Sequence, residues 1–162
     1  MLSHAYSIVH STSHSAGCPD TQSKSNMEND WWVEESGEHG YQVKSEFADT
    51  MKLRTKKLVL RHIKLFQALP QSEEARIIGK QLLRSASSTG ANYRAACRAR
   101  SKAEFFSKLC ITIEEADESL FWLEILEESG IMEEKKLTSL KTETLEILKI
   151  LAKARLTLKE QS

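Results

Sequence analysis

The chain has 162 residues, a length that suits one compact domain, and 40% of them are hydrophobic, which is enough for a buried core. With 28% charged residues, 6 glycines, 2 prolines and a mean hydropathy of -0.42, the composition excludes a membrane-embedded protein and a collagen-like fibre. The three cysteines, Cys18, Cys97 and Cys110, lack zinc-site spacing, so we expect reduced thiols and a cytoplasmic location.

Charge is unevenly distributed, although 23 basic and 23 acidic residues cancel over the whole chain. The net charge is −6 over residues 1–50, +11 over 51–110, −9 over 111–134 and +4 over 135–162. Such a division permits pairing within the chain, self-association between unlike faces, or contact with a polyanion. The sequence alone leaves all three open.

Residues 1–45 are expected to form a disordered acidic tail. They are rich in Ser, His, Gly and acidic residues and show neither the period of a helix nor the alternation of a strand. Translation from Met27 or Met51 would remove part or all of this segment. No long apolar run occurs in the chain, so we predict no contact with a membrane.

Residues 46–162 are predicted to be all-α and to form an antiparallel up-down-up-down four-helix bundle. Apolar residues recur there at steps of three and four, and glycine and proline are scarce. The first helix spans about 46–68 and ends before Leu69-Pro70, because proline disfavours helical backbone in the residue ahead of it. Connections of a few residues between long helices favour the up-down order.

Cap residues define the other three helices. Ser72 is expected to cap the second helix, and Ser101-Lys102-Ala103-Glu104 has the spacing of a capping box at the start of the third. Ser129-Gly130 ends the third helix, since glycine tolerates the left-handed cap conformation. The fourth helix, about 133–159, has a core seam of Leu137, Leu140, Thr144, Ile147, Leu151, Ala154 and Leu158.

Extra apolar residues widen the core stripes of the third and fourth helices. They are Phe105, Cys110, Phe121 and Trp122 in the third helix and Leu145, Leu148 and Ala152 in the fourth. Apolar surface beyond what a core needs indicates an interface between subunits, and a thick core is the alternative. We therefore expect a homo-oligomer.

The second helix carries a basic stripe opposite its core side. On a helical wheel the core side holds Ile78, Leu82, Ser85, Thr89 and Tyr93. The stripe consists of Arg76, Lys80, Arg84, Arg94, Arg98 and Lys102, provided that the helix continues through this range. A row of guanidinium groups can follow a nucleic-acid backbone and release its counterions, whereas a solvated face, or one paired with the acidic third helix, is the alternative. Only one aromatic residue lies nearby, which favours charge recognition without base readout.

The middle of the second helix is unusual in two respects. Residues 85–91 are all small, and several of them are poor helix formers, so either the helix kinks there or another backbone approaches closely. Asn92 lies at the edge of the predicted core, where a half-buried amide has to be hydrogen-bonded. We predict a structural role for Asn92 in fixing the helix register.

No pattern in the sequence indicates catalysis or cofactor binding. The acidic residues of 114–118 lack the Glu-x-x-His pairs of a di-iron bundle, and His62 is the only histidine of the helical segment. Cys97 and Cys110 have no histidine partner, and no phosphate-binding glycine motif is present. We expect no catalytic residue, no cofactor, no metal and no small-molecule substrate.

Several segments together resemble one family. They are Arg54-Thr55-Lys56-Lys57, Gln67-Ala68-Leu69-Pro70, Gln81-Leu82-Leu83-Arg84-Ser85, Gly90-Ala91-Asn92-Tyr93-Arg94-Ala95-Ala96-Cys97-Arg98-Ala99-Arg100-Ser101 and Glu114-Glu115-Ala116-Asp117-Glu118-Ser119-Leu120-Phe121-Trp122-Leu123-Glu124. Over about residues 46–155, the chain resembles the bacterial four-helix-bundle family encoded in intervening sequences of 23S ribosomal RNA genes.

The resemblance implies a compact antiparallel bundle that assembles into a ring-like homo-oligomer, a pentamer. That family is similar to the accessory protein of diversity-generating retroelements, a basic ring that engages a reverse transcriptase and nucleic acid. The family encoded in 23S rRNA intervening sequences has no established catalytic role, and its association with RNA is inferred mainly from gene location. Carried over by position, its motif points to Arg84, Asn92, Arg94, Arg98 and Arg100. The long tail and the acidic third helix of this chain depart from the family.

These observations lead to one hypothesis and one alternative. The hypothesis is a non-enzymatic, homo-oligomeric four-helix bundle that binds RNA or a ribonucleoprotein through the basic face of the second helix. The candidate contact residues are Arg76, Lys80, Arg84, Arg94, Arg98, Arg100 and Lys102. The alternative is a structural or protein-binding oligomeric scaffold, such as a reverse-transcriptase accessory subunit.

Overall fold

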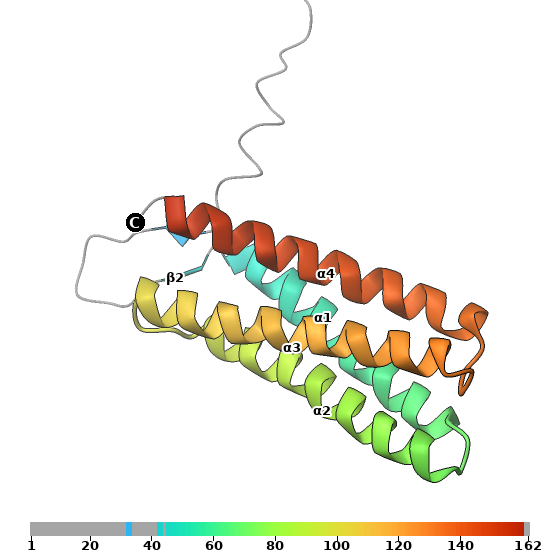
Figure 1. The fold of residues 1–162 in the computed structure, drawn as a ribbon. Helices are drawn as coiled ribbons and strands as arrows, with labels where there is room; N and C mark the ends of the chain where they lie inside the picture. The colour runs from blue at the N-terminus through green and yellow to red at the C-terminus, as the bar shows by residue number, and fades with distance from the viewer. Residues whose placement is uncertain (1–31, 34–41, 44, 161–162) are drawn as a thin grey trace, which may run out of the picture.

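A computed structural model describes residues 32–33, 42–43 and 45–160. Its four long helices are α1 (Ser45–Ala68), α2 (Glu73–Ala96), α3 (Lys102–Glu128) and α4 (Glu134–Glu160) (Figure 1). The predicted all-α, four-helix class is confirmed, and the observed limits of α1, α3 and α4 lie within one or two residues of the predicted ones.

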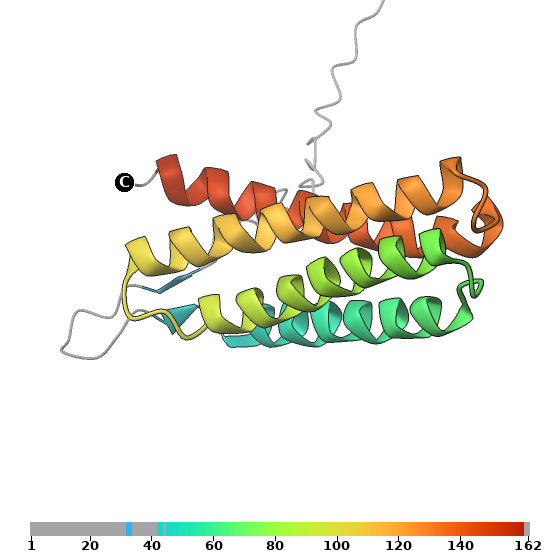
Figure 2. The same cartoon turned by 60° about the horizontal axis from the view of Figure 1, so that its bottom comes forward.

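As one moves forward along a helix, the residue it contacts on the neighbouring helix moves backward along the chain. Gly90 in the second half of α2 faces Val59 in the middle of α1, and Gly79 near the start of α2 faces the end of α1. Ser85 contacts Ser119 across α2 and α3, and Glu127 near the end of α3 contacts Lys141 near the start of α4. The short connections therefore lie at alternating ends of the bundle (Figures 1 and 2).

The expected disordered tail, residues 1–45, falls mainly outside the described residues. Within that range, β1 (Trp32–Val33) and β2 (Gln42–Val43) form a two-residue antiparallel pair, with Trp32 opposite Val43. Nothing in the sequence predicted this element. Valine and tryptophan favour extended backbone, but two residues are too few to produce a visible period in the sequence.

The predicted caps are confirmed. Ser72 Oγ accepts a hydrogen bond from the backbone N–H of Ala75, and Ser101 Oγ accepts one from Glu104 at 3.1 Å. The Glu104 carboxylate accepts the backbone N–H of Arg100, one residue before the position that a capping box uses. Gly130 has a φ of 71°, as expected of a left-handed helix end.

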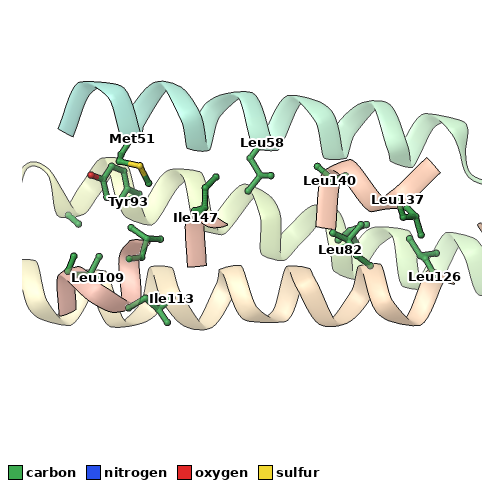
Figure 3. Packing of buried hydrophobic residues seen from close by; sticks show 14 of the residues in the cluster. Met51, Leu58, Leu82, Tyr93, Leu109, Ile113, Leu126, Leu137, Leu140 and Ile147 are labelled. Atoms are coloured by element: carbon green, nitrogen blue, oxygen red, sulfur yellow. The ribbon is translucent and has the colours of Figure 1, made fainter. Parts of the chain in front are cut away.

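The hydrophobic core runs along the whole bundle axis (Figure 3). All seven residues of the predicted α4 seam are buried. In α3, Leu109, Ile113 and Leu123 are buried as predicted, whereas Phe106 and Leu120 are half-buried because they border hollows between α3 and α4. The core therefore follows the predicted stripes, with deviations where two helices diverge.

The small-residue segment of α2 permits close approach rather than a kink. The helix is continuous from Glu73 to Ala96. Ser119 Oγ of α3 lies 3.0 Å from Ser85 Oγ, and a Cβ added at Gly90 would lie 2.9 Å from Val59 Cγ2 of α1. Small residues are thus required on two sides of α2, because neighbouring helices contact it there.

His62 is a buried polar residue of the core. Its side chain has 0% exposure, and Nδ1 lies 2.9 Å from the Leu58 carbonyl oxygen. Nε2 has no hydrogen-bond partner among the described residues. Burial lowers the pKa of His62 from 6.5 to about 4, since the charged imidazolium would lose its hydration.

Replacing Ser101 with Ala should lower the free energy of unfolding by about 1 kcal/mol, because the Glu104 N–H loses its acceptor. Urea denaturation followed by circular dichroism measures the change. Ser107→Ala is the matched control, since Ser107 is exposed inside α3 and its hydroxyl forms no hydrogen bond with a described residue. An equal loss in both variants would contradict a capping role for Ser101.

Acid should destabilise the protein through His62. The unfolded chain takes up this proton near pH 6.5 and the folded chain only near pH 4, so stability falls as pH decreases through that interval. The loss is at most about 3 kcal/mol. Urea denaturation at pH 7 and pH 4.5 should show a smaller loss for His62→Leu than for the natural chain. The same pH dependence in both would show that His62 is not responsible.

Candidate nucleic-acid interface

A hollow of about 590 Å³ lies between α1 and α2, towards the end of the bundle where α1 begins and α2 ends. We call it the α1–α2 groove. Both helices contribute to its lining, which includes basic, apolar and small side chains. The lining residues are Lys52, Leu53, Lys56, Val59, Leu60, Ser87, Gly90, Ala91, Arg94, Cys97 and Arg98.

The α2 wall of the groove is low because its side chains are short. Ser87, Gly90 and Ala91 come from the small-residue segment that lets α1 approach α2. A backbone or ligand can come close to α2 where no long side chain intervenes. Gly90 therefore serves the contact with Val59 of α1 and also lines the hollow beside that contact.

Four cations surround this hollow. Lys52 and Lys56 are contributed by α1, and Arg94 and Arg98 by α2 and the residues just after it. Lys52 pairs with Asp49, whereas Lys56, Arg94 and Arg98 form no ion pair with any residue that the structure describes. Unpaired guanidinium and ammonium groups around a concave surface attract anions, especially phosphate.

Exposed apolar side chains also border the groove. Leu53 is 53% exposed and Leu60 is 50% exposed, one two-turn step along α1. Cys97 lines the groove as well, but burial raises the pKa of its thiol. A thiol with a raised pKa is a poor nucleophile at neutral pH.

The predicted basic stripe is broken, because the second helix does not continue from Arg76 to Lys102. α2 ends at Ala96, and α3 begins at Lys102, with Ser101 as its cap. Arg98 and Arg100 therefore lie in the connection, and Lys102 belongs to the next helix. Ser101 caps α3, and a residue that caps a new helix cannot continue the previous one, so one unbroken helix could not include Lys102.

Several predicted contact residues are engaged with carboxylates instead of lying in the groove. Arg76 pairs with Glu73 at 2.9 Å, Arg84 with Glu118 at 3.0 Å, and Arg100 with Glu104 at 3.3 Å. Of the predicted set, only Arg94 and Arg98 line the groove.

Two lysines of the predicted set lie elsewhere. Lys80 is exposed on α2. Lys102 borders a separate hollow with Phe106 and Leu158.

Asn92 is half-buried on α2, and its side-chain amide forms no hydrogen bond with a described residue. Its predicted role in helix register stays a prediction. Tyr93, the one aromatic residue considered for base stacking, is 2% exposed and is part of the core. None of the groove-lining residues is aromatic. The groove therefore has charge and shape but no stacking platform.

Lys52 and Lys56 were not among the contacts predicted from the sequence. Lys56 belongs to the segment Arg54-Thr55-Lys56-Lys57, which was noted only for its resemblance to a family. The missing information was which side of α1 faces α2. The close contact of Gly90 with Val59 supplies it, because Lys52, Lys56 and Val59 lie on one side of α1.

The acidic residues of α3 pair partly with neighbouring helices. Glu118 accepts hydrogen bonds from Arg84 of α2 and from Trp122 Nε1, and Glu127 pairs with Lys141 of α4 at 2.8 Å. Burial and the nearby Glu118 carboxylate raise the pKa of Glu115. In the described part of the chain, no cluster of three or more His, Cys, Asp and Glu side chains could hold a metal ion.

None of the described helices combines the length and hydrophobicity needed to cross a membrane.

The family was established by comparison with known proteins. The family model described as 23S rRNA-intervening sequence protein matches residues 50–153, which include every residue of the α1–α2 groove. The chain belongs to this family. The family's match therefore covers the helical bundle almost from the first turn of α1 to the last turns of α4.

A solved structure supports the same assignment. The chain is similar to a protein of unknown function from the S23 ribosomal protein family of Bacteroides thetaiotaomicron, with 31% identity and a TM-score of 0.63. The match covers 67% of this chain and 96% of that one. No curated protein matches the chain. The family and the bundle fold are thus shared with a protein whose own function is described as unknown.

Proposed function

We propose that this 23S rRNA-intervening sequence protein is a non-enzymatic, homo-oligomeric protein that binds RNA in the α1–α2 groove. The convergence of Lys52, Lys56, Arg94 and Arg98 on one hollow carries the proposal, since three of them have no ion pair among the described residues. RNA would contact these groups through its phosphates.

The groove's chemistry favours recognition of the RNA backbone. Cations that replace condensed counterions give affinity that decreases steeply with salt. The short side chains of Ser87, Gly90 and Ala91 leave room for a sugar-phosphate backbone near α2. Sequence discrimination by base stacking is not expected, because none of the lining residues is aromatic.

The family description adds context to this proposal. It connects these proteins with 23S rRNA through the intervening sequences named in it. An oligomer would present one groove per subunit, so that a single RNA could engage several grooves and gain avidity. The five-membered ring implied by the resemblance is one such arrangement.

Exposed leucines in the groove favour a second candidate function. Leu53 and Leu60 could pack against the apolar face of an acidic amphipathic helix from another protein, whereas phosphate binding does not require exposed leucines. This is the scaffold alternative, of which a reverse-transcriptase accessory subunit is an example. A natural chain that binds no RNA at 50 mM salt would favour this alternative over RNA binding.

The double variant Arg94→Ala, Arg98→Ala should weaken RNA binding by about tenfold at low salt, because two phosphate contacts are lost. The slope of log affinity against log salt should become shallower by roughly 1.5 for single-stranded RNA. Fluorescence anisotropy of a labelled 20-nucleotide RNA, titrated with the protein at 50 and 200 mM salt, measures both.

The matched control is Arg76→Ala, Lys80→Ala. It removes the same amount of charge, but both residues lie on α2 outside the groove. RNA binding should change little in this control. Equal weakening by the two double variants would mean that RNA responds to overall charge and would overturn the groove as the binding site.

A further inference from the structure

A second hollow with basic side chains lies between α1 and α4, on the opposite side of α1 from the α1–α2 groove. Its volume is about 360 Å³, and it lies at the end of the bundle where α1 ends and α4 begins. Three of its lining residues are basic, Arg61, Lys64 and Lys136, and none is acidic. We call it the α1–α4 hollow.

The three cations of the α1–α4 hollow differ in how far they are already engaged. Lys64 is exposed and forms no ion pair with a residue that the structure describes. Arg61 donates a hydrogen bond to Ser139 Oγ of α4 at 3.0 Å, and a hydroxyl does not neutralise its charge. Lys136 pairs with Glu133 at 3.1 Å. Anion binding in this hollow therefore depends mainly on Lys64 and Arg61.

The outward surface of α1 connects the α1–α2 groove with the α1–α4 hollow. At about 100° per residue, with Val59 facing α2 at 0°, Lys56 of the groove lies at about 60°. Lys64 and Lys57 follow at about 140° and 160°, and Arg61 of the hollow lies at about 200°. Lys57 is exposed and, like Lys56 and Lys64, forms no ion pair within the described ranges. Four cations thus cross α1 from one depression to the other.

This crossing contains no acidic residue of α1. Residues 50–68 have neither Asp nor Glu, whereas the two acids of the helix, Glu46 and Asp49, lie in its first two turns. On α4, the Glu143 carboxylate accepts two hydrogen bonds from Arg54, at 2.7 and 3.2 Å, so it is already engaged. An anionic strand that crosses α1 would therefore meet positive potential on the whole way.

We propose that RNA bound in the α1–α2 groove continues across the outward surface of α1 and places a further phosphate in the α1–α4 hollow. Lys57 and Lys64 contact the backbone during the crossing, and Arg61 and Lys64 bind the phosphate in the hollow. The rise along α1 from Lys56 to Lys64 is about 12 Å, so a strand of several nucleotides is needed. The path rests on the proposed RNA binding and adds to it a second anion site and a minimum RNA length.

Charge favours this direction over the other way out of the groove. Beyond Arg98, the connection leads to Arg100, which is bound to Glu104. The segment 111–134 then has nine acidic residues and no basic one, and it would repel a phosphate backbone.

A flexible RNA strand also suits the shape of the path. It carries a charge at every nucleotide and can bend round a convex helix, so it can engage both depressions at once. A straight acidic helix of another protein could contact only one of them. The two depressions together therefore favour RNA as the occupant.

Lysine footprinting of the full-length chain tests the path. An amine-acetylating reagent modifies exposed lysines, and mass spectrometry gives the rate at each position with and without a 20-nucleotide RNA at 50 mM salt. RNA should lower the rates at Lys57 and Lys64 by about threefold or more, as at Lys56 in the groove, because phosphates cover these ammonium groups. The rates at Lys80 and Lys149 should not change, since both are exposed on other helices and line neither depression.

The double variant Lys57→Ala, Lys64→Ala provides an independent measurement by fluorescence anisotropy. It should bind the 20-nucleotide RNA about tenfold more weakly than the natural chain at 50 mM salt, because two phosphate contacts are lost. A 4-nucleotide RNA is too short to fill the groove and reach the hollow, so its affinity should change by about twofold or less. The matched variant Lys80→Ala, Lys149→Ala removes the same charge elsewhere and should alter neither affinity.

The outcomes separate the path from the groove. Protection of Lys56 without Lys57 and Lys64, or equal weakening for both RNA lengths, would overturn the path and leave the groove as the binding site. Equal weakening by the two double variants would overturn the path as well, because RNA would then respond to overall charge. No protection at Lys56 would overturn groove and path together and would favour an acidic protein partner.

Discussion

Close approach of α1 and α3 to the small-residue segment of α2 is the constraint on which the other features depend. On one side the hydroxyls of Ser85 and Ser119 meet at 3.0 Å, and on the other Gly90 leaves no space for a side chain against Val59. Helices that lie so near each other align their residues in one register, because any slip would bring larger side chains into the contact. This register determines which residues border the α1–α2 groove and which face solvent.

The fold could be predicted from the sequence because its determinants are local. The α4 seam follows a strict three-and-four spacing, and all its members are buried. Ser72, Ser101 and Gly130 act within one helical turn, so their effect is visible in a few consecutive residues. The two-residue strand pair before α1 was missed because it joins separated residues without any repeated pattern.

The candidate site was only partly predictable, because it depends on contacts between helices. Arg94 and Arg98 were found from the charge of α2, whereas Lys52 and Lys56 belong to the site only through the way α1 lies against α2. The distribution of charge along the sequence also cannot show which basic residues form ion pairs with carboxylates of other helices. Arg84 lies in the same basic stripe as Arg94, yet it is held by Glu118 from a helix 34 positions further along the chain.

The unpaired cations of the groove have a consequence for the fold itself. Lys56, Arg94 and Arg98 border one hollow, so folding brings three like charges to one part of the surface. Dissolved salt screens such repulsion within about 10 Å at 0.1 M ionic strength. If RNA binds there as proposed, its phosphates would stabilise the folded bundle, and the free energy of unfolding would then rise with occupancy of the groove.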